Sequence, residues 1–201
     1  IMLSLFSGFL LSIAFVLLTL SLKDTSASSS ALYVSLGVFV VPVLSRVFLK
    51  KKINILFFLA IFLAFLGVMF LNYDSSVHLS FQFTKGALLA FLSAVFFGIQ
   101  IFILVVYFKN SNILNLTFFQ LLFIFLFILI FWLLLGDKNL TTIKSDDYLN
   151  ILFLGTFAGG FAYLSQTYAS KYLSEYTCNI ILYLETFFAV LIAILFGLQC
   201  I

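Results

Sequence analysis

Long apolar runs separated by short polar breaks dominate the pattern of hydrophobic and polar positions along this chain. A bilayer core about 30 Å thick requires roughly 20 helical residues, and each run is long enough to cross it. The backbone inside lipid must satisfy its own hydrogen bonds, and an uninterrupted apolar run such as residues 118–135 lacks the alternation of a membrane β-strand. The pattern therefore predicts an all-α polytopic membrane protein with seven spans, at about residues 2–22, 30–49, 53–71, 86–107, 113–135, 149–169 and 177–199.

The amino-acid composition supports this prediction and excludes a soluble protein. Of the 201 residues 65% are hydrophobic and 8% are charged, whereas a soluble domain carries about 25% charged residues. Such a composition leaves no charged surface for a nucleic-acid partner. Cys178 and Cys200 have neither the number nor the spacing of a metal site, so we expect no metal and no cofactor.

The basic residues predict the orientation in the membrane. Cytoplasmic loops carry the excess of Lys and Arg, so the start of the chain and the loop at residues 50–52 are expected in the cytoplasm. The abundance of Phe, Ile, Leu, Lys and Asn fits an AT-rich coding sequence and favours the cytoplasmic (inner) membrane of a bacterium. The basic residues of the predicted cytoplasmic loops are Arg46, Lys50, Lys51, Lys52, Lys109 and Lys171, and those of the outer loops are Lys23, Lys85, Lys138 and Lys144.

Two short motifs recur in the same order along the chain. LFSG at residues 5–8 returns as LFLG at 152–155, and Lys-x-x-Ser at 23–26 returns at 171–174, an offset of 147 to 148 residues (152 − 5 and 171 − 23). Short matches in an apolar chain also arise by chance, but the shared order and offset favour a repeat. Five spans separate the two copies, so the second copy is inverted in the membrane. Inverted repeats are typical of secondary transporters that bind substrate near the membrane midplane.

The repeat predicts a helical bundle built from two inverted five-helix units. The first unit, residues 1–71, holds the spans 2–22, 30–49 and 53–71 and is incomplete at its N-terminus. The second, residues 86–201, holds the other four spans and is incomplete at its C-terminus. Two complete units would have ten spans, so we expect this chain to be a fragment that lacks two helices in front and one behind.

The segments TSASSSALYVSLGVFVVPVLSRVFLKKKI (25–53) and GTFAGGFAYLSQTYASKYLSEYTCNIILYLETFFAVLIAILFG (155–197) carry a family resemblance. The first resembles the third and fourth helices of the EamA family of the drug/metabolite transporter superfamily, and the second resembles its eighth and ninth helices. GALLAFLSAVFFGIQIFIL (86–104) and the helix bearing Gln120 are similar to its sixth and seventh. Thr186 departs from the family, in which proline often stands there. The resemblance implies transport of a small metabolite and leaves the substrate open.

Glu185 is the one ionisable residue deep inside a predicted span. A charged carboxylate at the bilayer centre costs roughly 2.5–3.5 kcal/mol on insertion scales, so it is retained for a reason. In the functional interpretation it titrates a proton or binds a substrate amine. In the structural interpretation it makes a hydrogen bond that holds two helices in register.

Other polar residues inside the spans are candidates for a substrate path. Asn179, Tyr183 and Thr186 form one helical stripe, and Gly159, Tyr163, Gln166 and Ser170 form another on the preceding helix. Helix–helix contact is the alternative role for such residues, and interhelical hydrogen bonds for the amides. The substrate-path candidates are Glu185, Tyr183, Asn179, Gln166, Tyr163, Gln100 and Gln120.

Pro42 is the single proline of the chain and lies inside a predicted span. It removes one helical hydrogen bond and is expected to kink or open the helix locally. Such a break serves as a hinge in some transporters, and in other membrane helices it is only a packing kink. Pro42 is therefore the hinge candidate.

The features together predict a secondary transporter, or permease, for a small organic metabolite or drug-like molecule, working by alternating access. No nucleotide-binding loop of the P-loop type is present, so ATP is not expected as the energy source. A non-transporting membrane scaffold or assembly subunit is the alternative. An intramembrane enzyme is less favoured, because it would need a catalytic cluster at membrane depth. The expected partners are a small-molecule substrate and the lipid bilayer, and a homodimer stays open.

Overall fold

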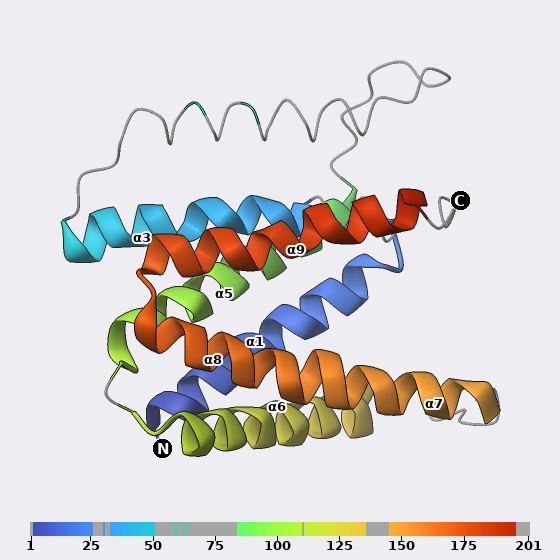
Figure 1. Ribbon diagram of the computed structural model, residues 1–201. Helices are drawn as coiled ribbons and strands as arrows, with labels where there is room; N and C mark the ends of the chain where they lie inside the picture. Colours follow the sequence, from blue (N-terminus) through green and yellow to red (C-terminus); the bar gives the residue numbers. More distant parts are fainter. Residues whose placement is uncertain are drawn as a thin grey trace.

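The computed structural model describes residues 2–25, 33–50, 84–109, 111–135 and 145–195, together with Ser30, Leu59 and Leu63. Over these residues it is an all-helical bundle, which confirms the predicted fold class (Figure 1). Its elements are α1 (Met2–Ser21), η1 (Leu36–Phe39), α3 (Val40–Leu49), α5 (Lys85–Tyr107), α6 (Ile113–Leu135), α7 (Ser145–Phe153), η3 (Leu154–Phe161), α8 (Ala162–Tyr172) and α9 (Glu175–Leu195).

The helix lengths match those that a membrane requires. Four helices of the described part are long and apolar enough to span a bilayer: Met2–Ser21, Lys85–Tyr107, Ile113–Leu135 and Tyr148–Tyr172. A shorter apolar helix, Tyr33–Leu49, includes η1 and α3, and α9 adds 21 residues. Six predicted spans therefore coincide with helices, and the seventh, 53–71, lies outside the described residues apart from Leu59 and Leu63. The chain is a helical, multi-pass integral membrane protein.

Small side chains let α1 and α5 pack closely at the centre of the bundle. The facing surfaces are built from serine, glycine and alanine, which allow two helix backbones to approach where lipid gives no hydrophobic driving force. Ser93 on α5 donates a 2.8 Å hydrogen bond to the backbone carbonyl of Ala14 on α1. Helix α5 also contacts α3, α8 and α9, so it is the central helix of the described bundle. The small residues buried on the two helices, apart from Gly8, which faces α6, and Gly98, which faces Val40, include Ser4, Ser7, Ser12 and Ala14 on α1, and Gly86, Ala87, Ala90, Ser93 and Ala94 on α5.

Helix α6 has a narrow buried face and a broad apolar face that is open. Its buried residues are spaced to lie on one side of the helix, against α1 and α8, and the other sides carry exposed Phe, Leu and Ile. In a membrane these exposed side chains contact lipid. The buried residues of α6 are Leu116, Thr117, Gln120 and Ile124.

Helices α7 and α8 are joined by a π-helical segment, η3, into one rod (Figure 1). The predicted span 149–169 lies inside this longer rod. The π segment contains Gly155, Gly159 and Gly160, and π geometry within a helix occurs often at functional sites. The hydrophobic pattern did not predict it, because a π turn changes the helix period too little to alter an unbroken apolar run.

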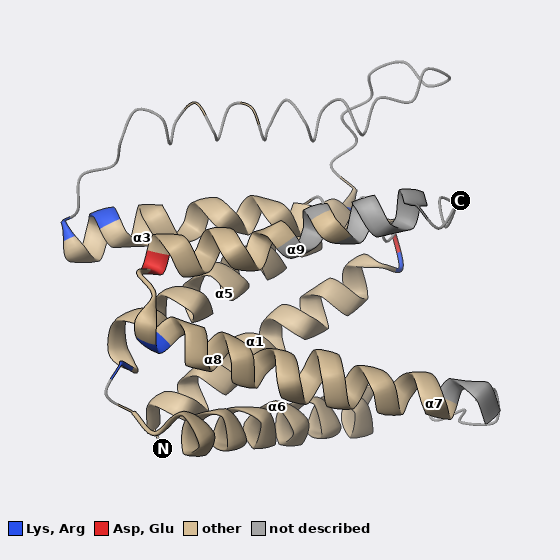
Figure 2. Ribbon diagram, viewed as in Figure 1, with Lys and Arg blue, Asp and Glu red and all other residues tan. Residues whose placement is uncertain are grey.

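Basic residues gather at one end of the bundle. Arg46 lies in the last turn of α3, Lys171 in the last turn of α8, and Lys109 just after α5. These three helix ends meet on the left of the view, whereas Lys23 and Asp24 follow α1 at the opposite end (Figure 2). The partition of the described residues agrees with the two sets of loops predicted from the sequence. The cytoplasmic location of the first end stays a prediction.

Two glycines set the distance between α5 and the helix Tyr33–Leu49. A Cβ atom added at Gly37 would lie 2.7 Å from the backbone oxygen of Ala94 and would overlap the hydroxyl of Tyr183. A Cβ atom at Gly98 would overlap the Cβ atom of Val40. Neither position has room for a side chain unless a backbone moves.

The substitution Gly37→Ala is therefore expected to destabilise the bundle by about 1–3 kcal/mol, the usual cost of overpacking a close contact. Thermal unfolding in detergent micelles measures the effect. Gly155→Ala is the matched control, because nothing lies within 4 Å of a Cβ atom at Gly155. Equal melting temperatures for the two variants would contradict the close packing described here.

Candidate functional site

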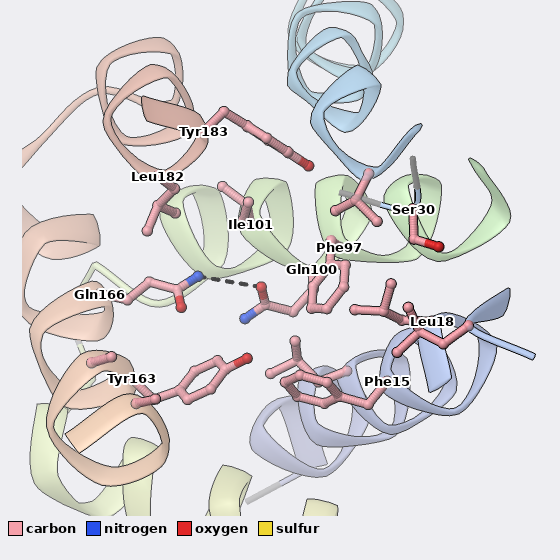
Figure 3. A pocket seen from close by; sticks show the side chains of 15 residues that line it. Phe15, Leu18, Ser30, Phe97, Gln100, Ile101, Tyr163, Gln166, Leu182 and Tyr183 are labelled. Carbon is pink, nitrogen blue, oxygen red and sulfur yellow. Dashed lines mark hydrogen bonds between the residues drawn. The ribbon is translucent and has the colours of Figure 1, made fainter. Parts of the chain in front are cut away.

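A cavity of about 570 Å³ lies between α1, α5, α8 and α9, in the range typical of small-molecule sites (Figure 3). Helix η3 and the start of the helix Tyr33–Leu49 complete its wall. Its lining residues are Leu11, Phe15, Leu18, Leu22, Ser30, Val34, Phe97, Gln100, Ile101, Ala158, Ala162, Tyr163, Gln166, Leu182 and Tyr183.

The lining is apolar and aromatic with a few uncharged polar groups. None of these lining residues is Asp, Glu, Lys, Arg or His. Within the described ranges, no three His, Cys, Asp or Glu residues are grouped so that they could hold a metal ion. The chemistry available in the cavity is therefore hydrogen bonding and ring contact.

Aromatic rings from three helices form one side of the cavity. The ring of Phe15 on α1 lies edge-on to that of Phe97 on α5, with centroids 5.4 Å apart. The same ring lies edge-on to Tyr163 on α8, at 6.2 Å. Edge-to-face pairs at these distances are favourable.

Two glutamine side-chain amides form the polar side of the cavity. Gln100 on α5 donates from Nε2 to the hydroxyl oxygen of Ser7 at 3.4 Å. Its Oε1 accepts from Nε2 of Gln166 on α8 at 3.5 Å, the bond drawn across the cavity in Figure 3. Both distances exceed the 2.7–3.2 Å usual for N–H···O bonds, so these contacts are weak and easily exchanged.

Four of the predicted substrate-path residues line this one cavity: Gln100, Tyr163, Gln166 and Tyr183. The spacing of Tyr163 and Gln166 placed them on one face of a helix. No pattern in the sequence indicated that this face would meet Gln100, which lies 66 residues from Gln166 along the chain. That these side chains contact a substrate stays a prediction.

Asn179, a fifth candidate, is buried in a helix junction outside the cavity lining. Its Nδ2 donates a 2.6 Å hydrogen bond to the backbone carbonyl of Val38, and 1% of the residue is exposed. Val38 stands four residues before Pro42, whose nitrogen has no hydrogen to donate to that carbonyl. Asn179 thus supplies the donor that the proline removes.

Pro42 itself is buried near the start of α3, directly after the 3-10 turn η1. The turn before a proline within a span is expected to depart from α-geometry, and η1 shows this departure. The structure describes one conformation, so the hinge role of Pro42 stays a prediction.

Gln120 lies on the buried face of α6, apart from the cavity lining. Its backbone oxygen would be 3.0 Å from a Cβ atom at Gly8, so α1 and α6 meet closely there. The side chain is 1% exposed, and its two polar atoms have no hydrogen-bond partner in the described part of the chain. Ser170, from the stripe on α8, bonds to the carbonyl of Thr167 within its own helix.

The side chains of Glu185 and Thr186 lie outside the described residues, although α9 includes both positions. The two interpretations of Glu185 therefore both stay open.

Sequence reasoning missed Phe15, Phe97 and Ser30 as cavity residues. An aromatic residue inside an apolar run gives no signal that distinguishes a cavity from lipid. Ser30 lies in a serine-rich segment of the sequence that does not single it out, and its hydroxyl also contacts the hydroxyl groups of Ser21 and Thr25 at 3.2 and 2.7 Å.

The bond between Asn179 and Val38 predicts a coupled effect of two substitutions. Asn179→Ala is expected to cost about 0.5–1.5 kcal/mol of unfolding free energy, because it removes the hydrogen bond to the Val38 carbonyl. Pro42→Ala restores a backbone N–H four residues after Val38, so in that background the cost of Asn179→Ala is expected to fall by about 1 kcal/mol.

Unfolding of the wild type, both single variants and the double variant measures this coupling. A control cycle uses Ser165→Ala, at an exposed position of α8, in place of Asn179→Ala. The changes in unfolding free energy caused by Ser165→Ala and Pro42→Ala are expected to be additive. Additive changes in unfolding free energy in both cycles would show that Pro42 and Asn179 do not affect the same carbonyl.

The sequence matches the EamA-like transporter family over residues 1–73 and 84–199, nearly the whole chain. No curated protein gives a significant match. The chain belongs to the EamA-like transporter family.

Proposed function

We propose that this protein is a secondary transporter that moves a small organic molecule across a membrane by alternating access. The observation that carries the proposal is the cavity, because helices from both predicted repeats line it. Helix α1 and Val34 belong to the first predicted repeat, and α5, α8 and α9 to the second. A site between inverted repeats can open to either side when one repeat rocks against the other.

The junction of Val38, Pro42 and Asn179 supports this mechanism. It joins the helix Tyr33–Leu49 of one predicted repeat to α9 of the other through a short, part-buried hydrogen bond. The local break at η1 gives that helix a position where its two ends can change their relative angle. We propose that this junction is the pivot of the transport cycle.

The driving force is proposed to be an ion or substrate gradient, since no P-loop is present in the sequence. Glu185 is the residue proposed for proton coupling, and a structural hydrogen bond is its other proposed role. The composition supports a bacterial cytoplasmic membrane as the location. A non-transporting scaffold remains the second candidate function, and it predicts no solute flux.

Flux measurements on the full-length protein in proteoliposomes test the proposal. We expect gradient-dependent uptake or release of at least one solute from a panel of amino acids, nucleosides, sugars and drug-like amines. Glu185→Gln is expected to abolish the dependence on a proton gradient if that carboxylate couples transport to protons.

Asp24→Asn is the matched control, because it makes the same chemical change at an exposed position next to the end of α1. It is expected to keep the wild-type flux. Unchanged gradient dependence in Glu185→Gln would assign Glu185 the structural role. Absence of flux for every solute, from protein shown to be folded, would favour the scaffold function.

A further inference from the structure

We infer that the cavity accepts an uncharged solute that carries a flat ring and an amide-like edge with one hydrogen-bond donor and one acceptor. This inference names the solute class of the proposed transporter, and its relevance to transport rests on the proposed function. Three properties of the described lining residues define the solute class. None of their side chains is charged, aromatic rings form one wall, and two glutamine amides lie together.

The lining favours a neutral solute over an ion. A cavity at membrane depth is a medium of low polarity, and an ion loses its hydration there unless an opposite charge replaces it. Among the described lining residues, no side chain carries a formal charge at neutral pH. A neutral solute loses far less hydration free energy, and hydroxyl and amide groups of the lining can replace its hydrogen bonds to water.

The aromatic wall favours a flat ring. Phe15 holds Phe97 and Tyr163 in edge-on contact, so the three rings are oriented by one another (Figure 3). Leu18 and Ile101 are apolar neighbours in the same lining. A ring bound here gains both apolar burial and edge-to-face contacts.

The amide pair favours a solute edge that both donates and accepts. Gln100 and Gln166 are joined by one 3.5 Å contact, which leaves an acceptor on Gln166 and further N–H groups on both amides. A solute carboxamide can take the place of this contact by donating to one glutamine oxygen and accepting from one glutamine N–H.

A matched series of three probes tests the inference directly. Benzamide, benzoate and benzamidinium share a ring and a flat substituent of nearly equal size, and differ in charge. Their binding to the full-length protein in nanodiscs is measured by saturation-transfer NMR, with empty nanodiscs as the lipid background. We expect benzamide to bind at least about tenfold more tightly than either ion.

Variants of Gln166 separate recognition by the amide from general packing. Gln166→Leu is expected to weaken benzamide binding about two- to tenfold, the effect of losing one or two neutral hydrogen bonds. Gln166→Glu is expected to shift the preference toward benzamidinium, a gain that a merely structural residue would not produce. Ser165→Leu is the control, because it changes the adjacent, exposed position of α8 and is expected to leave the binding of all three probes unchanged.

The outcomes distinguish this inference from the proposed function. Preference for benzoate, or failure of benzamide to bind folded protein, would overturn the inference even if flux of other solutes is observed. Preference for benzamidinium that Glu185→Gln removes would also overturn it, in favour of a carboxylate site. Benzamide binding as expected, in a protein that shows no flux, would support the inference about the cavity and overturn the transport proposal.

Discussion

The carbonyl of Val38, which Pro42 leaves without its helical donor, is the constraint on which the arrangement of α3, α5 and α9 depends. A buried polar group without a partner costs several kcal/mol in lipid, so another donor has to reach it. Asn179 does so at 2.6 Å from α9, 141 residues away along the chain. One turn further along α9, the hydroxyl of Tyr183 lies against Gly37, and the tyrosine joins the cavity wall. The bond to the Val38 carbonyl and the contact of Tyr183 with Gly37 thus both hold α9 against the helix Tyr33–Leu49.

Helix α5 packs on α1 over several turns and also contributes to the cavity. Ser93 donates to the Ala14 carbonyl, and two turns further along Gln100 bonds to Ser7, so the two helices are in contact at both levels. Phe97, one turn after Ser93, lies edge-on to Phe15 of α1, and both rings line the cavity. Gly98 on the other side of α5 keeps Val40 close. The central helix therefore holds two neighbouring helices close while its larger side chains reach the cavity.

The apolar runs were sufficient to predict the helices that the structure describes, because lipid imposes one length and one backbone structure on every run. They also placed Tyr163 with Gln166 on one helix face. The sequence could not predict which distant residues meet. The link from Gln100 to Gln166 and that from Asn179 to Val38 each join residues on different helices, and helical periodicity says nothing about neighbouring helices. Asn179 was predicted as a path residue from its stripe, whereas its partner is a backbone atom that no side-chain pattern reveals.

The proposed alternating access requires polar contacts of two kinds. A pivot has to persist through the cycle, which favours a short bond such as that of Asn179 to Val38, at 2.6 Å. A substrate site has to exchange partners, which favours long and weak bonds such as those of Gln100 to Ser7 and Gln166, at 3.4 and 3.5 Å. If the two amides were already tightly paired, a solute would have to break strong bonds to bind. In the proposed mechanism, the length of these contacts therefore distinguishes the pivot from the substrate site.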